Sequence, residues 1–93
     1  MQMTTQIPIT IINNIPNLVI KHYQLTVDGN LTLGQLLLQI RNFYNITNSE
    51  GLYLFINNTT LEPNTTLLIQ VYERYKDSDN NLYIHLYKEN TFG

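Results

Sequence analysis

The sequence predicts an α+β fold in which one mixed, four-stranded sheet packs on one main helix. Three observations lead to this prediction. Apolar residues alternate near the start of the chain, a long apolar stripe at helical spacing follows, and an apolar strand lies near the end. The 93 residues, 43% of them apolar, suffice for one modest core. We therefore expect one domain over residues 6–88, preceded by a short polar segment (1–5) and followed by a tail (89–93).

The first part of the chain predicts a β-hairpin. Ile7, Ile9 and Ile11 lie at every second position, which is the period of a strand with one buried face. Residues 13–17 are rich in Asn and Pro and predict a turn. Residues 18–27 predict the second strand, which Asp28 and Gly29 end. Its expected core face consists of Val19, Tyr23, Leu25 and Val27.

Two helices are predicted in the middle of the chain. Thr32 is a good N-cap, and Gln35 three residues later completes a capping box. The helix that follows carries one apolar stripe at three- and four-residue spacing, which should face the core. The stripe consists of Leu33, Leu36, Leu37, Ile40, Phe43 and Tyr44. A shorter helix is expected after Pro63, capped by Thr65 or Thr66. Its expected inward residues are Leu68, Val71, Tyr72 and Tyr75.

Two further strands complete the sheet. Residues 52–56 form a short apolar run, and residues 82–87 alternate with Leu82, Ile84 and Leu86 on one face. The order is then strand, strand, helix, strand, short helix, strand. Two hairpin strands, a helix packed across them and two returning strands are typical of a β-grasp fold.

Composition excludes several classes of protein. The net charge is −2 and no block of Lys or Arg occurs, which argues against binding nucleic acid electrostatically. The chain has no cysteine, so a disulfide framework or a common zinc site is not expected. The first basic residue is Lys21, and the apolar runs are too short to span a bilayer. These features favour a cytoplasmic protein.

No catalytic group of residues can be assembled from the sequence. His22 and His85 both lie in strand patterns, and neither has a credible nucleophile as a partner. No phosphate-binding or dinucleotide-binding glycine pattern occurs among the four glycines. We therefore expect a protein that is not an enzyme and needs no metal or cofactor.

Two features remain that can carry function. A strong strand leads into a short polar tail that contains Gly93, and glycine lacks the Cβ that would hinder attack on its carbonyl in a narrow enzyme channel. The carboxylate of Gly93 is thus a candidate for activation and transfer to an amine. The strand over residues 18–27 should lie at the sheet edge, where its backbone could pair with an extended peptide or simply face solvent.

The chain resembles the GABARAP family, the lipid-conjugated ubiquitin-like modifiers of autophagy (the autophagy-related protein eight branch). The C-terminal signature of that family is matched by residues 75–83, Tyr87 and residues 89–93. Further matches lie in residues 7–9, 31–35, 40–41 and 52–57. The resemblance covers nearly the whole chain from Gln6 and implies a ubiquitin-like β-grasp fold.

The resemblance also implies a pathway. An activating enzyme would adenylate the carboxylate of Gly93, which follows Phe92, and transfer the chain to a cysteine thiol. A conjugating enzyme would then pass it to the amine of phosphatidylethanolamine, which anchors the protein to the autophagosome membrane. In this family the edge strand also pairs with adaptor peptides, whose aromatic and aliphatic anchors fill two pockets. By position, the aliphatic pocket and its flank correspond to Lys21, Tyr23, Leu25, Leu31 and Leu36.

The chain departs from the family pattern at three points. It lacks the two N-terminal helices that help to build the aromatic pocket, it has Phe43 where the family has a basic residue, and it has Asn81 where the family has an aromatic one. Two alternatives therefore stay open. One is the sister modifier joined to a protein lysine (the autophagy-related protein twelve branch). The other is a β-grasp interaction domain that is never conjugated.

Overall fold

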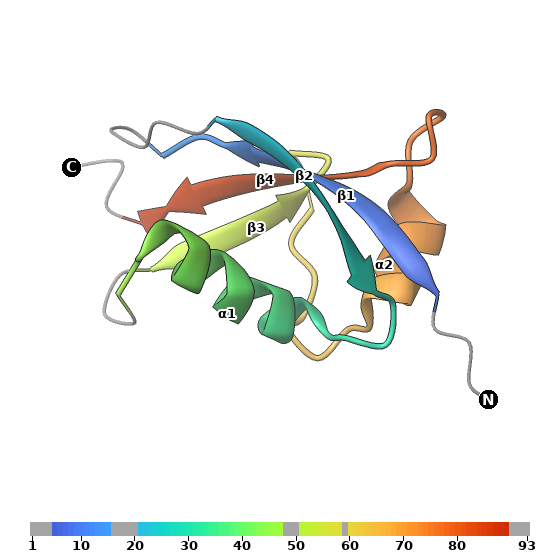
Figure 1. Cartoon of the computed structure of the whole chain (residues 1–93), viewed down its shortest axis with the longest axis horizontal. Helices are drawn as coiled ribbons and strands as arrows, with labels where there is room; N and C mark the ends of the chain where they lie inside the picture. The colour runs from blue at the N-terminus through green and yellow to red at the C-terminus, as the bar shows by residue number, and fades with distance from the viewer. Residues whose placement is uncertain (1–4, 16–20, 48–50, 59, 90–93) are drawn as a thin grey trace.

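The computed structural model describes residues 5–15, 21–47, 51–58 and 60–89. Within these ranges the predicted order of elements is confirmed (Figure 1). The elements are β1 (Gln6–Asn13), β2 (His22–Asp28), α1 (Leu33–Tyr44), β3 (Leu52–Ile56), α2 (Leu68–Tyr75) and β4 (Leu82–Lys88). The predicted α+β class is confirmed, with one mixed four-stranded sheet, one main helix and one short helix.

The sheet has the strand order β2-β1-β4-β3. β1 pairs antiparallel with β2 and parallel with β4, and β3 pairs antiparallel with β4. Pro8 has no N–H to donate. It lies opposite Thr26 of β2, and the two residues exchange no hydrogen bonds. Pro8 also precedes the first pair between β1 and β4, which is Ile9 with Leu82. A proline is therefore tolerated in a central strand because no ladder bond is lost there.

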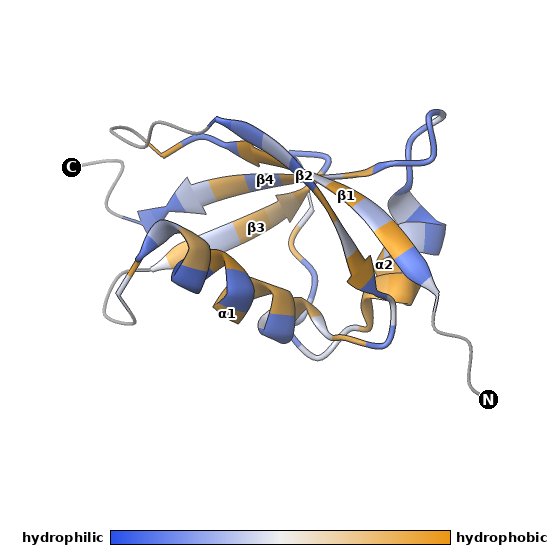
Figure 2. Ribbon diagram, in the orientation of Figure 1, coloured by the Kyte–Doolittle hydropathy of each residue, from blue (hydrophilic) through white to orange (hydrophobic). Residues whose placement is uncertain are grey.

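One face of the sheet packs on α1, and the core lies between them. Figure 2 shows apolar and polar residues interspersed along the strands and α1. Every second residue of each strand points into the core, as the alternation predicts. The fully buried side chains come from β1, β3, β4 and both helices: Ile7, Ile9, Ile11, Leu33, Leu36, Ile40, Ile56, Leu68, Val71, Leu82, Ile84 and Leu86.

The start of α1 is capped as predicted. The Thr32 hydroxyl accepts from the Gln35 N–H at 3.2 Å, and the Gln35 side chain accepts from the Thr32 N–H at 2.8 Å. These reciprocal bonds satisfy two backbone donors that a helix start otherwise leaves unpaired.

The predicted cap of α2 is wrong. Its N-cap is Leu67, and no side chain of Thr65 or Thr66 bonds to the helix start. The first donors of α2 instead reach backbone carbonyls of the segment before α1: the Leu68 N–H donates to the Leu31 oxygen at 2.8 Å, and the Ile69 N–H to the Gly29 oxygen at 2.9 Å. Tertiary contacts thus replace a local hydroxyl cap.

Several predicted positions need correction. Phe43 is 50% exposed and is not part of the core. Tyr72 and Tyr75 pack on the core only partly, and their hydroxyls donate to the Asn80 carbonyl and to Glu62. The second strand is described from His22 to Asp28, while Val19, assigned to its core face, lies outside the described residues. Of the helices in the part of the chain described here, none has the length and apolarity needed to cross a bilayer.

Candidate functional site

The outer edge of β2 is one edge of the sheet, as the sequence predicted. The hydrogen bonds from the Asn13 N–H to the Lys21 oxygen (2.6 Å) and from the Gly29 N–H to the Thr5 oxygen (2.8 Å) fix which pairs are bonded to β1. Tyr23, Leu25 and Val27 therefore form hydrogen-bonded pairs with β1, and their backbone N–H and C=O groups point toward β1. The backbone N–H and C=O groups directed to the outer edge therefore belong to His22, Gln24, Thr26 and Asp28.

The side of β2 that faces α1 carries an aromatic cluster. The ring of Tyr23 stacks on Phe43 with centroids 4.5 Å apart and an interplanar angle of 23°. Tyr44 meets both rings edge-on, at 5.9 Å from Tyr23 and 5.0 Å from Phe43. Burial raises the pKa of Tyr23 to about 12, and the neighbouring Tyr44 adds to this effect. The Tyr23 hydroxyl is thus neutral over the whole physiological range.

The five residues assigned to adaptor binding occupy different environments. Tyr23 and Leu25 lie on the core-facing side of β2, and both are half-buried. Leu31, just before α1, is also half-buried and packs on the core. Leu36 is completely buried, so it can serve a pocket only as its floor. Lys21 is exposed directly before β2, and its ammonium donates to the Ile15 carbonyl oxygen at 3.3 Å.

Sequence reasoning placed Phe43 in the core and did not anticipate its contact with Tyr23. The half-exposed ring of Phe43 covers one face of Tyr23, a residue of the edge strand β2. A peptide side chain therefore cannot reach the face of the Tyr23 ring that Phe43 covers. The sequence signal that could have suggested this is the place of Phe43 at the margin of the helical stripe.

The tail begins where β4 ends. The Glu89 N–H donates to the Gly51 oxygen at 2.9 Å, which extends the β3–β4 ladder by one pair. A Cβ on Gly51 would lie 2.6 Å from the Cβ of Glu89, so only glycine lets the Glu89 side chain lie across the start of β3. Phe92 and Gly93, the predicted conjugation residues, lie outside the described residues.

The two histidines flank the same residue of β1. His22 and His85 are both paired with Ile12, one from each side, on the sheet face opposite α1. Burial lowers the pKa of His85, and the charge of His22 lowers it further. Among the described residues, no group of three or more His, Asp or Glu side chains could hold a metal ion.

Comparison with known proteins identifies the family. The family model described as "Autophagy protein Atg8 ubiquitin like" matches residues 1–93. The chain belongs to the Atg8 family. It is similar to autophagy-related protein 8 of Dictyostelium discoideum, with 44% identity over 68 residues, which cover 72% of this chain and 55% of the relative. It is also similar to autophagy-related protein 8 of Kluyveromyces lactis, with 35% identity over 81 residues, 87% of this chain and 63% of the relative.

A solved structure supports the same assignment. The crystal structure of Trypanosoma brucei ATG8 superposes with a TM-score of 0.79 at 27% identity, covering 95% of this chain and 77% of that chain. The predicted resemblance and the ubiquitin-like fold are thus confirmed. Membership in the Atg8 family makes the chain a ubiquitin-like protein of autophagy and not an enzyme. The chain spans 55% and 63% of the length of the two curated relatives.

Proposed function

We propose that this Atg8-family chain is a modifier that is activated at the carboxylate of Gly93 and conjugated to phosphatidylethanolamine on autophagic membranes. The observation that carries the proposal is the match of the family model over residues 1–93, a range that includes Gly93 and the strand before it. In the conjugated state the protein is associated with the autophagosome membrane, and before conjugation it is cytoplasmic.

The chemistry is a series of acyl transfers that partner enzymes catalyse. The Gly93 carboxylate attacks the α-phosphate of ATP, and pyrophosphate leaves. A cysteine thiolate of the activating enzyme attacks the resulting acyl adenylate, and AMP leaves. After transfer to the cysteine of a conjugating enzyme, the amine of phosphatidylethanolamine attacks the thioester carbonyl. An amide forms, the amine loses a proton, and the thiolate leaves.

The fold is suited to a protein whose C-terminal tail is bound by enzymes while the domain stays folded. β4 lies in the interior of the sheet between β1 and β3, and its inward side chains Leu82, Ile84 and Leu86 are fully buried. The tail therefore follows a central strand whose inward face is fully buried. Enzymes can pull on the tail without unfolding the domain, because local opening of a central, buried strand is costly.

Thioester formation tests the proposal. The 93-residue chain, incubated with ATP and the activating and conjugating enzymes of the autophagy pathway, should form a thioester that a reducing agent cleaves. Gly93→Ala should abolish this product, whereas Leu38→Ala, at an exposed position of α1, should leave it intact. Intact-mass analysis of the final product then separates attachment to a lipid from attachment to a protein lysine. Absence of any thioester with the unaltered chain would refute conjugation.

We also propose that the outer edge of β2 pairs with an extended adaptor peptide. The outward-directed backbone groups of His22, Gln24 and Thr26 support strand addition. An aliphatic side chain of the peptide would lie against Leu25 and Leu31 above the buried Leu36. An aromatic anchor would contact the neighbouring part of the edge, and Lys21 would flank the start of the paired strand.

Hydrogen exchange distinguishes strand addition from other kinds of binding. A bound peptide should newly protect the amides of Gln24 and Thr26, whereas those of Tyr23 and Leu25 already bond to β1 and should change little. NMR signals from Lys21 to Leu25 should also shift on titration with peptides that carry aromatic and aliphatic anchors. Shifts confined to other parts of the sheet, or protection without this alternation, would contradict pairing at β2.

A further inference from the structure

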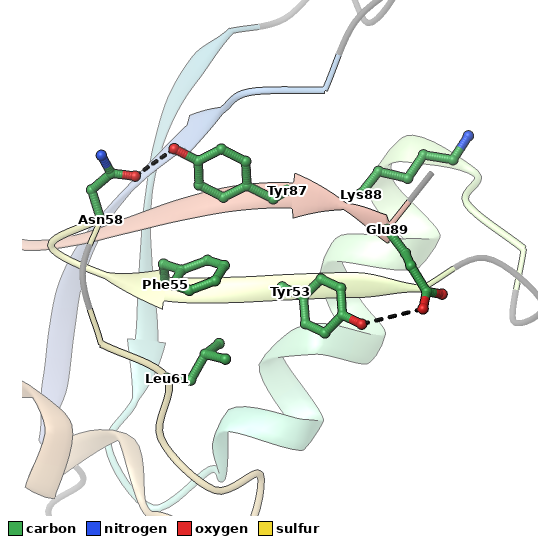
Figure 3. Close-up of a pocket in the computed structure, with 7 residues that line it drawn as sticks. All are labelled: Tyr53, Phe55, Asn58, Leu61, Tyr87, Lys88 and Glu89. Carbon is green, nitrogen blue, oxygen red and sulfur yellow. Dashed lines mark hydrogen bonds between the residues drawn. The ribbon is translucent and has the colours of Figure 1, made fainter. Parts of the chain in front are cut away.

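A groove of about 570 Å³ lies on the sheet face opposite α1, over the edge strand β3 and the end of β4 (Figure 3). The rings of Tyr53, Phe55 and Tyr87 and the side chain of Leu61 line it. Phe55 lies edge-on to Tyr87 with centroids 5.4 Å apart, and its ring centroid is 6.5 Å from that of Tyr53. Tyr53 is 39% exposed and Leu61 54%. We call this surface the aromatic groove.

The tyrosine hydroxyls that line the aromatic groove are hydrogen-bonded at its two ends. The Tyr87 hydroxyl donates to the Asn58 side-chain oxygen at 2.5 Å, and the Tyr53 hydroxyl donates to Glu89 at 3.5 Å. Figure 3 shows these two bonds on either side of the space above Phe55. The polar groups are therefore already partnered, and the middle of the groove presents aromatic carbon. Such a surface suits an apolar or aromatic side chain.

The aromatic groove lies at the root of the tail. Lys88, the last residue of β4, and Glu89, the first residue of the tail, both line it. Among residues 90–93 the only aromatic one is Phe92, three residues beyond Glu89, and three residues reach about 10 Å. Asn90 is a residue type that favours turns, so the chain can reverse direction between Glu89 and Phe92. We infer that the aromatic groove is an intramolecular docking site for the side chain of Phe92.

The consequence for conjugation rests on the proposed function. A docked Phe92 holds Gly93 beside the sheet, whereas an enzyme channel needs the tail extended. Docking therefore competes with activation and makes the groove an autoinhibitory element. If the tail is docked for about nine-tenths of the time, the activating enzyme captures it with about tenfold weaker apparent affinity. Enzyme binding removes this inhibition by selecting the undocked tail.

NMR on the full chain tests the docking without any enzyme. The chain has three phenylalanines, so single substitutions assign the ring signals of Phe92 after selective labelling. Docking predicts nuclear Overhauser effects (NOEs) from the Phe92 ring to Tyr53, Tyr87 and Leu61, and an upfield shift of its ring protons. Leu61→Glu should abolish both, because it places a charge in the groove. Leu38→Glu, at a 57% exposed leucine on α1, is the matched control and should leave both intact.

Two results would overturn the inference. One is a Phe92 ring with the shifts of an unfolded peptide and no NOE to the groove. The other is an NOE that appears only between labelled and unlabelled molecules in a mixed sample, since the occupant would then be a second copy. If conjugation itself fails while the Phe92 contacts are present, the docking stands and only its role in conjugation is lost. Conversely, if the contacts are present, Leu61→Glu should speed thioester formation up to about tenfold and Leu38→Glu should not.

Discussion

Removal of the Phe43 ring should destabilise the protein measurably although the ring is half exposed. A buried phenylalanine removes about 150–250 Å² from water, so a ring with 50% exposure accounts for about 100 Å². At about 25 cal/mol per Å² this area contributes about 2 kcal/mol, an upper value because the unfolded chain already buries some surface. Phe43→Ala should therefore lower the free energy of unfolding by about 1–2 kcal/mol. Leu38→Ala, on the same helix, should cost less than about 0.5 kcal/mol.

The geometry of the Phe43 contact gives a second readout. Because Phe43 covers one face of Tyr23, Phe43→Ala should bring the pKa of Tyr23 down from about 12 toward the ordinary value of 10.0. Titration of tyrosine ring carbons by NMR measures this, and urea denaturation measures stability. A double-mutant cycle of Phe43→Ala with Tyr23→Ala should give a coupling of about 0.5–1.5 kcal/mol. A coupling near zero together with an unchanged Tyr23 pKa would refute the stacked arrangement.

Two further predictions concern capping and pH. Thr32→Ala should cost about 1 kcal/mol in urea denaturation, because it removes the hydroxyl that caps α1, whereas Thr65→Ala should be nearly neutral because α2 has no side-chain cap. Equal losses would contradict the assignment of the caps. Burial holds the pKa of His85 below its ordinary 6.5, so the unfolded state binds more protons just below that pH. The stability contributed by neutral His85 is therefore present above pH 6.5 and is lost on acidification. The drop in unfolding free energy between pH 7.5 and 5.5 should be smaller in His85→Gln than in the unaltered chain.

Sequence reasoning succeeded where a local pattern determines the structure. The capping box at Thr32 and Gln35 involves residues three apart, and the alternation in β1 and β4 follows from the strand period alone. Phe43 was assigned wrongly because it lies about 80° around α1 from Leu33, at the margin of the apolar stripe. Whether such a residue is buried depends on how far the sheet extends beneath it. The sheet ends at β2 there, so one face of the ring contacts Tyr23 and the rest stays exposed.

The features that bear on function depend on long-range pairing, which no local pattern encodes. The backbone groups at the outer edge of β2 follow only from the register of β1 with β2. If the register shifted by one residue, the backbone groups of Tyr23 and Leu25 would point to the outer edge. Those of His22 and Gln24 would then bond to β1 instead. The aromatic groove likewise combines β3, the loop at Leu61 and the end of β4, which meet only in the folded chain. Sequence reasoning could identify its aromatic residues but not their contact.

The strand order also relates the outer edge of β2 to the proposed attachment point at Gly93. β4 runs parallel to β1, and β1 antiparallel to β2, so β4 ends where β2 begins. The Asn14 N–H donates to the Leu86 oxygen at 2.9 Å at this end of the sheet, and Asn13 bonds to Lys21 there. Gly93 lies five residues beyond Lys88, which span at most about 18 Å when extended. Conjugation of Gly93 to a lipid would therefore hold this end close to the bilayer surface. A peptide paired with β2 would then be bound beside the membrane, because the tether is too short to let the domain move away from it.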